Sequence, residues 1–283
     1  MKFGIALGAL NPRVHEEATL EAERLGYESV WLPEHLVFTR RMSRSPHPGD
    51  DHPPVPPDTP IYDAFAYLSY LAARTERVRL GTHVFNIGLR HPFTTARGAQ
   101  TVDLLSKGRF ELGIGASWLE EEWVAAQLDF ATRGRRVDEA IELCKRLWTE
   151  ETVSHHGEFF SFDEVAFAPK PVQPDGPPIL VGGESKAALR RAARLADGWI
   201  GMSHTFESGA AQIELLRKLL DEHGRSSAAD RFEIALAGPV ESSADVTRWE
   251  DLGVTRMILA PWKRSSDAID GLRRFADRVG LSG

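Results

Sequence analysis

The chain has 283 residues, of which 42% are apolar and 27% charged, the mixture of a soluble globular protein. Its single cysteine, Cys144, excludes an intrachain disulfide, and its net charge of −7 argues against a general nucleic-acid binder. No stretch approaches the roughly 20 apolar residues that span a bilayer, and the start shows no signal-peptide pattern. We therefore expect a cytoplasmic protein with no membrane and no nucleic-acid partner.

Short apolar runs alternate with apolar positions at helical spacing along the whole chain. The first run, Phe3–Leu7, is followed by a helical pattern that Gly26 closes. The fourth helical pattern is the clearest, and Cys144 lies on its apolar face. The expected strands cover residues 3–7, 29–32, 78–84, 109–115, 178–181, 199–202, 232–237 and 256–260. The helical patterns cover residues 14–25, 65–72, 92–105, 137–148, 185–196, 213–220, 246–252 and 269–279.

About eight strands alternating with about eight helices over this length are typical of an α/β fold, the (β/α)8 or TIM barrel. An open doubly wound sheet is the alternative. Against it, the turn Gly8–Asn11 lacks the Gly-x-Gly-x-x-Gly fingerprint, and no polar linker divides the chain. We predict one domain over residues 1–283, with a lid-like insertion at 36–60 and a hairpin insertion at 151–177. Because the first insertion lacks an apolar face, we expect ligand to order it.

The stretch from Pro177 to Met202 has the order strand, glycine turn, helix, strand. Gly182 and Gly183 follow the first strand, Ser185 is a candidate helix cap, and Gly198 is expected to end the helix in a left-handed conformation. Such a turn can leave backbone N–H groups free at a helix N-terminus, where they bind anions. The alternative is that the two glycines only make a tight turn.

Three histidines, His35, His83 and His204, lie at or next to strand ends, where such barrels place their working residues. Histidine titrates near neutral pH and can therefore donate or accept a proton during turnover. A metal site is the alternative, but no His-x-His or His-Glu-x-x-His spacing is present. No Gly-x-Ser-x-Gly elbow supports a hydrolase. Four other histidines lie in loop or hairpin segments and are interpreted as solvated: His47, His52, His155 and His156.

Several segments, spread in order over nearly the whole chain, carry a resemblance that is weak for each one and strong for all together. They are Ala22 to Trp31 with Glu34 and His35; Arg79 to Thr82; Lys107 to Trp118 with Glu122; Gly134 to Glu139; Pro169 to Gln173; and Pro177 to Gly183 with Ala196 to Trp199. On these segments the chain resembles the bacterial luciferase-like monooxygenase family. It is most similar to the branch that depends on the deazaflavin coenzyme F420.

The resemblance implies a (β/α)8 barrel that binds F420 or FMN at the C-terminal ends of its strands. It implies that Glu34 and His35 are an acid–histidine pair beside the cofactor ring, with His35 in catalysis. The bond between His83 and Val84 matches a non-proline cis peptide that supports the ring. The positions expected to contact the cofactor are Leu7, His83, Val84, Asn86, Gly115, Ala116, Ser117, Gly182, Gly183 and Ser185.

One position departs from the family's sugar-phosphate dehydrogenases, which place a catalytic glutamate just after the fourth strand. Trp118 stands there in this chain, so that reaction is not expected. A tryptophan suits a flat or apolar substrate stacked over the ring. We expect Trp118 and Ser203 to face a small-molecule substrate.

The first functional hypothesis is an F420-dependent oxidoreductase that moves a hydride between the deazaflavin and a small organic substrate. The second is an FMN-dependent monooxygenase that uses O2 and a partner reductase, and the third is a flavin-binding barrel without turnover. A site for the anionic F420 tail would separate the first two, and Arg40, Arg41 and Arg44 are candidates for it. A homodimer is the expected assembly.

Overall fold

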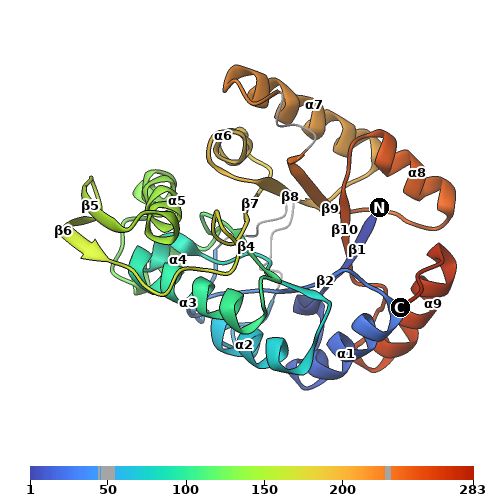
Figure 1. Ribbon diagram of the computed structural model, residues 1–283. Helices are drawn as coiled ribbons and strands as arrows, with labels where there is room; N and C mark the ends of the chain where they lie inside the picture. Colours follow the sequence, from blue (N-terminus) through green and yellow to red (C-terminus); the bar gives the residue numbers. More distant parts are fainter. Residues whose placement is uncertain (44, 46–54, 227–230) are drawn as a thin grey trace.

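In the computed structural model, which describes residues 1–43, 45, 55–226 and 231–283, eight parallel strands form a closed barrel (Figure 1). Their order around the barrel is β1-β10-β9-β8-β7-β4-β3-β2. The predicted TIM barrel is therefore confirmed. The strands are β1 (Lys2–Ala6), β2 (Ser29–Leu32), β3 (Arg79–Thr82), β4 (Phe110–Ile114), β7 (Ile179–Gly182), β8 (Gly198–Ser203), β9 (Glu233–Ala237) and β10 (Arg256–Leu259).

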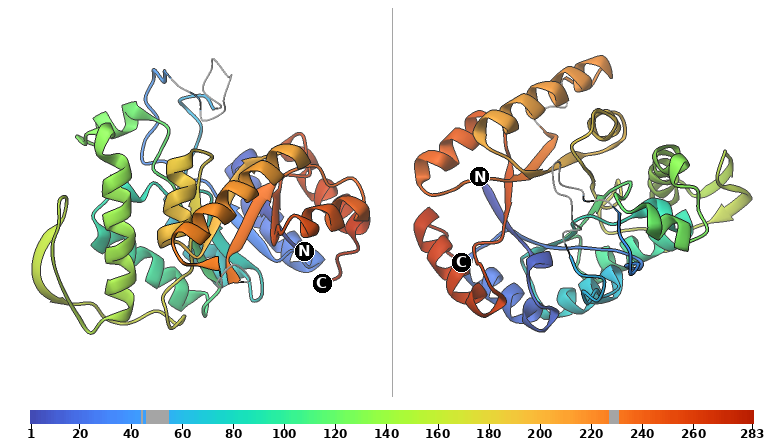
Figure 2. Two further views of the ribbon diagram at one scale, coloured as in Figure 1. Left: turned by 90° about the horizontal axis from the view of Figure 1, so that it is seen from above. Right: turned by 180° about the vertical axis from the view of Figure 1, so that it is seen from behind.

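Helices surround the barrel on its outside, as the view from behind shows (Figure 2). The sequence patterns predicted all of them except α4, which follows β4 where a loop was expected. Both chain ends lie on the same side of the barrel as α9 (Figure 1). The helices are α1 (His15–Leu25), α2 (Ala64–Arg74), α3 (Pro92–Leu105), α4 (Glu120–Ala125), α5 (Arg133–Thr149), α6 (Lys186–Leu195), α7 (Phe206–Glu222), α8 (Ser243–Asp251) and α9 (Ala268–Val279).

An antiparallel pair of strands, β5 (Thr152–His156) and β6 (Ser161–Ala166), stands beside α5 at the edge of the molecule (Figures 1 and 2). Glu139 of α5 holds it in place. The Glu139 carboxylate accepts the backbone N–H groups of Phe159 and Phe160, each at 3.0 Å, and lies 2.9 Å from His155 Nε2. One helix side chain thus anchors the hairpin turn, and His155 is engaged rather than solvated as its position had suggested.

The interior of the barrel is filled by an apolar layer around Trp31, which is fully buried. Its Nε1–H donates to Ser29 Oγ at 2.9 Å. A Cβ built on Gly4 or Gly81 would come within 2.8 or 2.3 Å of the indole, so only glycine leaves room for this ring. Leu180, Ile200, Ala235 and Ile258 complete the layer. Packing this dense leaves no channel along the barrel axis.

An ion-pair network closes the N-terminal end of the strands. The Arg256 guanidinium, 1% exposed, donates to Glu28 and Glu111 at 2.8 Å, and Glu233 lies 3.5 Å away. Arg79 also bonds to Glu111. Burial alone would lower the pKa of Arg256, but the surrounding carboxylates raise it above its usual range. Arg256 therefore keeps its charge inside the network at neutral pH.

Glycine caps follow the predictions at one helix and not at another. Gly26 ends α1 with a φ of +85°, the left-handed conformation expected there. Gly198 was predicted to cap α6, and this is wrong: Ala196 is the cap, in extended conformation, and Gly198 already begins β8. A Cβ on Gly198 would lie 2.7 Å from the Glu233 backbone O and Cβ, so close strand packing requires the glycine.

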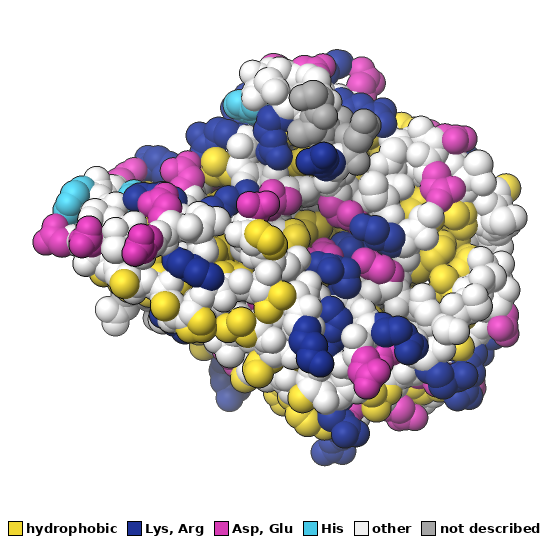
Figure 3. Space-filling view, in the orientation of Figure 1, with side chains coloured by type: hydrophobic (Ala, Val, Ile, Leu, Met, Phe, Trp, Pro, Cys, Tyr) yellow, Lys and Arg dark blue, Asp and Glu magenta, His cyan; other side chains and the backbone are white. Residues whose placement is uncertain are grey.

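The surface carries both signs of charge. Lys and Arg side chains are intermixed with Asp and Glu over the face visible in Figure 3. Among the helices of the described residues, none combines the length and apolar character needed to cross a bilayer.

Candidate active site

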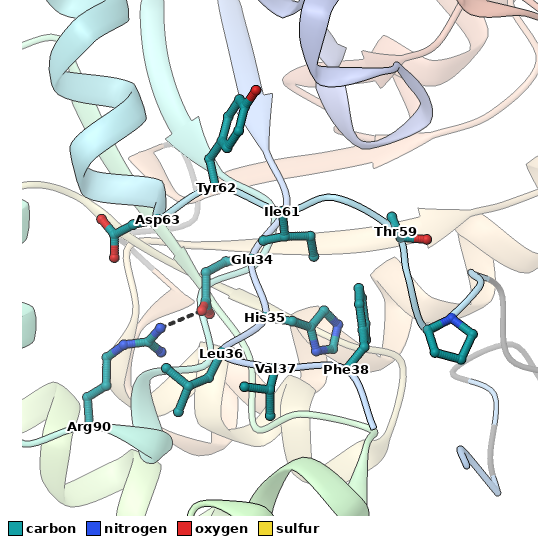
Figure 4. Close-up of a pocket in the computed structure, with 11 residues that line it drawn as sticks. Glu34, His35, Leu36, Val37, Phe38, Thr59, Ile61, Tyr62, Asp63 and Arg90 are labelled. Atoms are coloured by element: carbon teal, nitrogen blue, oxygen red, sulfur yellow. Dashed lines mark hydrogen bonds and ion pairs between the residues drawn. The ribbon is translucent and has the colours of Figure 1, made fainter. Parts of the chain in front are cut away.

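A cavity of about 290 Å³ lies beside the C-terminal end of β2. Its walls come from the residues directly after β2 and from the segment that leads into α2, as the close-up shows (Figure 4). Parallel pairing of β2 with β3 continues to Leu32 and Thr82, so residues beyond these two strand ends are neighbours. The lining residues are Glu34, His35, Leu36, Val37, Phe38, Pro57, Thr59, Ile61, Tyr62, Asp63 and Arg90.

Glu34, only 3% exposed, is held by residues that follow β3. Its Oε1 accepts from Arg90 Nη2 at 2.6 Å, and its Oε2 accepts the Asn86 N–H at 2.8 Å. The Asn86 side-chain amide donates to the Glu34 carbonyl at 3.3 Å. Burial raises the pKa of Glu34, while Arg90 and Asn86 oppose that shift. Glu34 and Asn86 thus bind each other, and Asn86, 3% exposed, presents little surface to a ligand.

His35 points the other way and pairs with Glu122 of α4. Its Nδ1 lies 3.0 Å from Glu122 Oε2, and the Glu122 side chain is fully buried. A carboxylate in this environment accepts hydrogen bonds, so Nδ1 carries the proton of the neutral ring and Nε2 is the basic atom. Within the described part of the chain, no protein group bonds Nε2. The arrangement equips His35 to exchange a proton with a bound molecule.

Two aromatic rings flank His35. The Phe38 ring centroid lies 4.6 Å from that of His35, and Trp118 meets His35 edge-on at 5.6 Å. Figure 4 shows the Phe38 and His35 rings side by side in the cavity wall. The predicted substrate residue Trp118 is thus brought next to the predicted catalytic histidine.

The peptide bond between His83 and Val84 is cis, as the resemblance implied. The Val84 side chain fits between two strand ends, because a Cβ on Gly115 or on Gly182 would come within 2.7 Å of it. Val84 also packs on the apolar layer inside the barrel. Three of the expected cofactor contacts, Val84, Gly115 and Gly182, therefore meet at the strand ends.

His83 lies beneath this mouth, with its ring edge-on to Trp31 at 6.5 Å. Burial lowers the pKa of His83 to about 4, so the ring is neutral at physiological pH. His83 therefore differs from His35, which has a carboxylate partner. The ring of His83 is a neutral polar group below the mouth.

The prediction that Gly182 and Gly183 both present free N–H groups is wrong for Gly183. Its N–H donates to Ile200 O at 3.3 Å and so belongs to the barrel ladder. Its φ of +119° explains why glycine stands there. Ser185 does cap α6 as predicted, accepting the Ala188 N–H at 3.1 Å. The N–H groups left without a partner inside the helix are those of its first turn.

The remaining expected contacts are placed as follows. Leu7 is fully buried and supports the mouth from within the core. Ser117 has a φ of +62°; its hydroxyl oxygen accepts the Leu119 N–H at 3.2 Å, and the hydroxyl lies 3.4 Å from Glu122 Oε2. Ala116 packs against the main core, and Ser203 is the exposed last residue of β8. His204 is separate from His35 and pairs with Glu184, with 3.1 Å between Nε2 and Oε2.

Three residues of the site, Glu122, Arg90 and Phe38, were not predicted from the sequence. Three consecutive glutamates, Glu120 to Glu122, would have predicted the start of α4, because acidic side chains favour the first turn of a helix. The lid hypothesis for residues 36–60 falls partly outside the described residues, as do Arg44, His47 and His52. Among the residues that the structure describes, no cluster of His, Cys, Asp and Glu could hold a metal ion.

Comparison with known proteins identifies the family. The family model for luciferase-like monooxygenases matches residues 1–274. An uncharacterised protein of Mycobacterium tuberculosis (strain ATCC 25618 / H37Rv) is 33% identical over 99% of both chains. The F420-dependent glucose-6-phosphate dehydrogenase of Kineococcus radiotolerans is 31% identical over 83% of this chain and 68% of its own length. In fold, the chain resembles the coenzyme F420 dependent tetrahydromethanopterin reductase of Methanopyrus kandleri, with a TM-score of 0.78, 15% identity and 98% of both chains covered.

These matches agree with the closed barrel and span almost all of the chain. The chain therefore belongs to the luciferase-like monooxygenase family and is an oxidoreductase of that family.

Proposed function

We propose that the protein is an F420-dependent oxidoreductase that moves a hydride between the deazaflavin and a small organic substrate. The observation that carries the proposal is His35, held by a buried carboxylate at Nδ1 and lining a cavity beside the barrel mouth. The 31% identical relative described as F420-dependent supports the choice of cofactor.

The residues of the barrel mouth suit a flat ring with an anionic tail. Gly115 and Gly182 lie against the Val84 side chain at the strand ends, where a larger residue would clash with it. The first turn of α6, capped by Ser185, offers N–H groups and a helix dipole to an acidic group. Arg40 and Arg41, both exposed, lie in the segment after β2 and add positive charge. We infer that these groups would hold F420.

When bound, the deazaflavin supplies or accepts the hydride. His35 Nε2 supplies the proton that accompanies a hydride gained by a carbonyl carbon, or takes it from an alcohol in the reverse direction. Phe38 and Trp118 exclude water from one side of His35 and favour an apolar substrate. Oxidation of a sugar phosphate is not proposed, because Trp118 replaces the family's catalytic glutamate.

Binding of F420 and of FMN, each followed by fluorescence side by side with the same protein preparation, tests the proposal. We expect F420 to bind at least tenfold more tightly than FMN. Tighter binding of FMN would overturn the proposal and favour the monooxygenase, which needs O2 and a partner reductase. A homodimer and a cytoplasmic location remain predictions, and sedimentation of the purified protein tests the former.

A further inference from the structure

The Glu122 carboxylate of α4 is bonded to several groups of the candidate site. Besides His35 Nδ1, its carboxylate accepts the backbone N–H groups of Leu36, at 2.5 Å, and Val37, at 3.3 Å. The Ser117 hydroxyl lies 3.4 Å from the same oxygen as His35. All of these groups can donate, so the carboxylate is satisfied as an anion without exposure to water.

These bonds fix both the ring and the chain that carries it. The bond at Nδ1 sets the orientation and the tautomer of His35, and the bonds to Leu36 and Val37 set the path of the cavity wall directly after it. A carboxylate that satisfies only the ring would leave this wall free to shift. Side chain and backbone are instead held from one point on another element.

Two carboxylates and one guanidinium lie close to the His35 ring. Glu34 and Glu122 are both buried, and the negative charge of Glu122 helps to raise the pKa of Glu34. Arg90 is the cation that pairs with Glu34. An imidazolium formed at His35 would face the Glu122 carboxylate as the Arg90 guanidinium faces Glu34.

We propose that Glu122 is the positioning residue of the site: it holds His35 with its proton on Nδ1, leaves Nε2 to exchange protons with the substrate, and stabilises the imidazolium formed in turnover. Glu122 acts through His35 and does not itself reach the reacting atoms. The proposal deepens the proposed function, since it depends on His35 as the proton-exchanging group.

Nitrogen NMR of the imidazole rings in the protein without cofactor tests the geometry. The chain has 10 histidines, so the His35→Gln variant identifies the His35 signals. At high pH we expect the wild-type ring to carry its proton on Nδ1. A proton on Nε2 instead would overturn the proposal. This measurement needs neither F420 nor a substrate, so it stands or falls independently of the proposed function.

The second measurement compares Glu122→Gln with Glu121→Gln. Glu121 is the matched control, because it lies on the same helix turn and its carboxylate accepts the Ser43 N–H at 2.8 Å. Glu122→Gln removes a negative charge beside the ring, so protonation of His35 needs a lower pH. Both its NMR titration and the matching limb of the pH–rate profile should move to lower pH, with kcat reduced roughly 10- to 100-fold, part of what acid–base catalysis contributes.

Glu121→Gln should leave the pH profile in place. If Glu122→Gln lowered the rate equally at all pH values, with an unchanged His35 titration, Glu122 would be only a structural residue and the proposal would fail. Should Glu122→Gln not fold, the wild-type tautomer decides the question.

Discussion

The two ends of the barrel bury charges in different ways. At the N-terminal end, Glu28, Glu111 and Glu233 surround Arg256. At the C-terminal mouth, Glu34 pairs with the guanidinium of Arg90, whereas Glu122 pairs with His35. An arginine keeps its proton in a protein, whereas a histidine can gain or lose one.

This difference assigns the two ends different tasks. A buried ion pair is poor at stabilising a fold, but removing one partner from it is costly, so such a network fixes structure. A histidine in place of a second arginine can exchange a proton with a bound molecule, which an arginine cannot do. Changes at the N-terminal end should therefore affect stability, and changes at the mouth should affect turnover.

The largest expected effect is on the rate of His35→Ala. Loss of acid–base catalysis should lower kcat by roughly 10²- to 10⁴-fold while the affinity for the cofactor changes little. Steady-state kinetics at saturating cofactor, with His156→Ala as control, measure it, because His156 is an exposed histidine of the hairpin. A variant that lost cofactor binding but kept its rate would make His35 a binding wall, with Glu34 or His83 as the next candidates for proton transfer.

The next effect is on the stability of Arg256→Met. The substitution leaves the buried carboxylate of Glu111 and its neighbours without their shared cation, which should cost about 3–5 kcal/mol of unfolding free energy. Urea unfolding measures this cost. Arg248→Met is the control, since its ion pair with Glu207 is exposed and should change stability little. Equal stability of the two variants would contradict the role of the N-terminal network in stabilising the fold.

The smallest effect is the pH dependence that His83 confers on stability. Burial lowers the pKa of His83 from 6.5 to about 4 in the folded chain. Between these two pH values, His83 therefore binds a proton in the unfolded chain but not in the folded chain. Stability should therefore decrease as the pH falls through this window, by at most about 3 kcal/mol from this group. Comparing urea unfolding of the wild type and His83→Gln at pH 7 and pH 4.5 isolates the contribution of His83, because the other groups titrate equally in both proteins. Parallel decreases in the two proteins would contradict it.

The alternation of strands and helices could be predicted from sequence because each element has its own local pattern. Apolar runs between glycines mark the strands, and the 3.6-residue period marks α5 most clearly. The short helix α4 has no such period over its six residues, and it was missed. The predicted cap at Gly198 was wrong because this glycine is required by close packing against Glu233 on the neighbouring strand. A contact between distant residues leaves no local sequence pattern.

Individual residues of the site could be predicted from the sequence, but their hydrogen-bond and ion-pair partners could not. His35 and Trp118 could be placed from strand ends and from the family resemblance. The partners that define their chemistry are distant in sequence: Glu122 lies 87 residues after His35, and Arg90 lies 56 residues after Glu34. Such pairs depend on which strands are neighbours in the closed barrel, and a single sequence gives no register for them.

The indole of Trp31 and the ion pairs below it determine from which side ligands can reach the barrel mouth. Since the barrel axis is closed from the middle to its N-terminal end, molecules bound at the mouth arrive and depart on the same side. A ligand that lies over another one in the mouth therefore covers the route by which the lower one leaves.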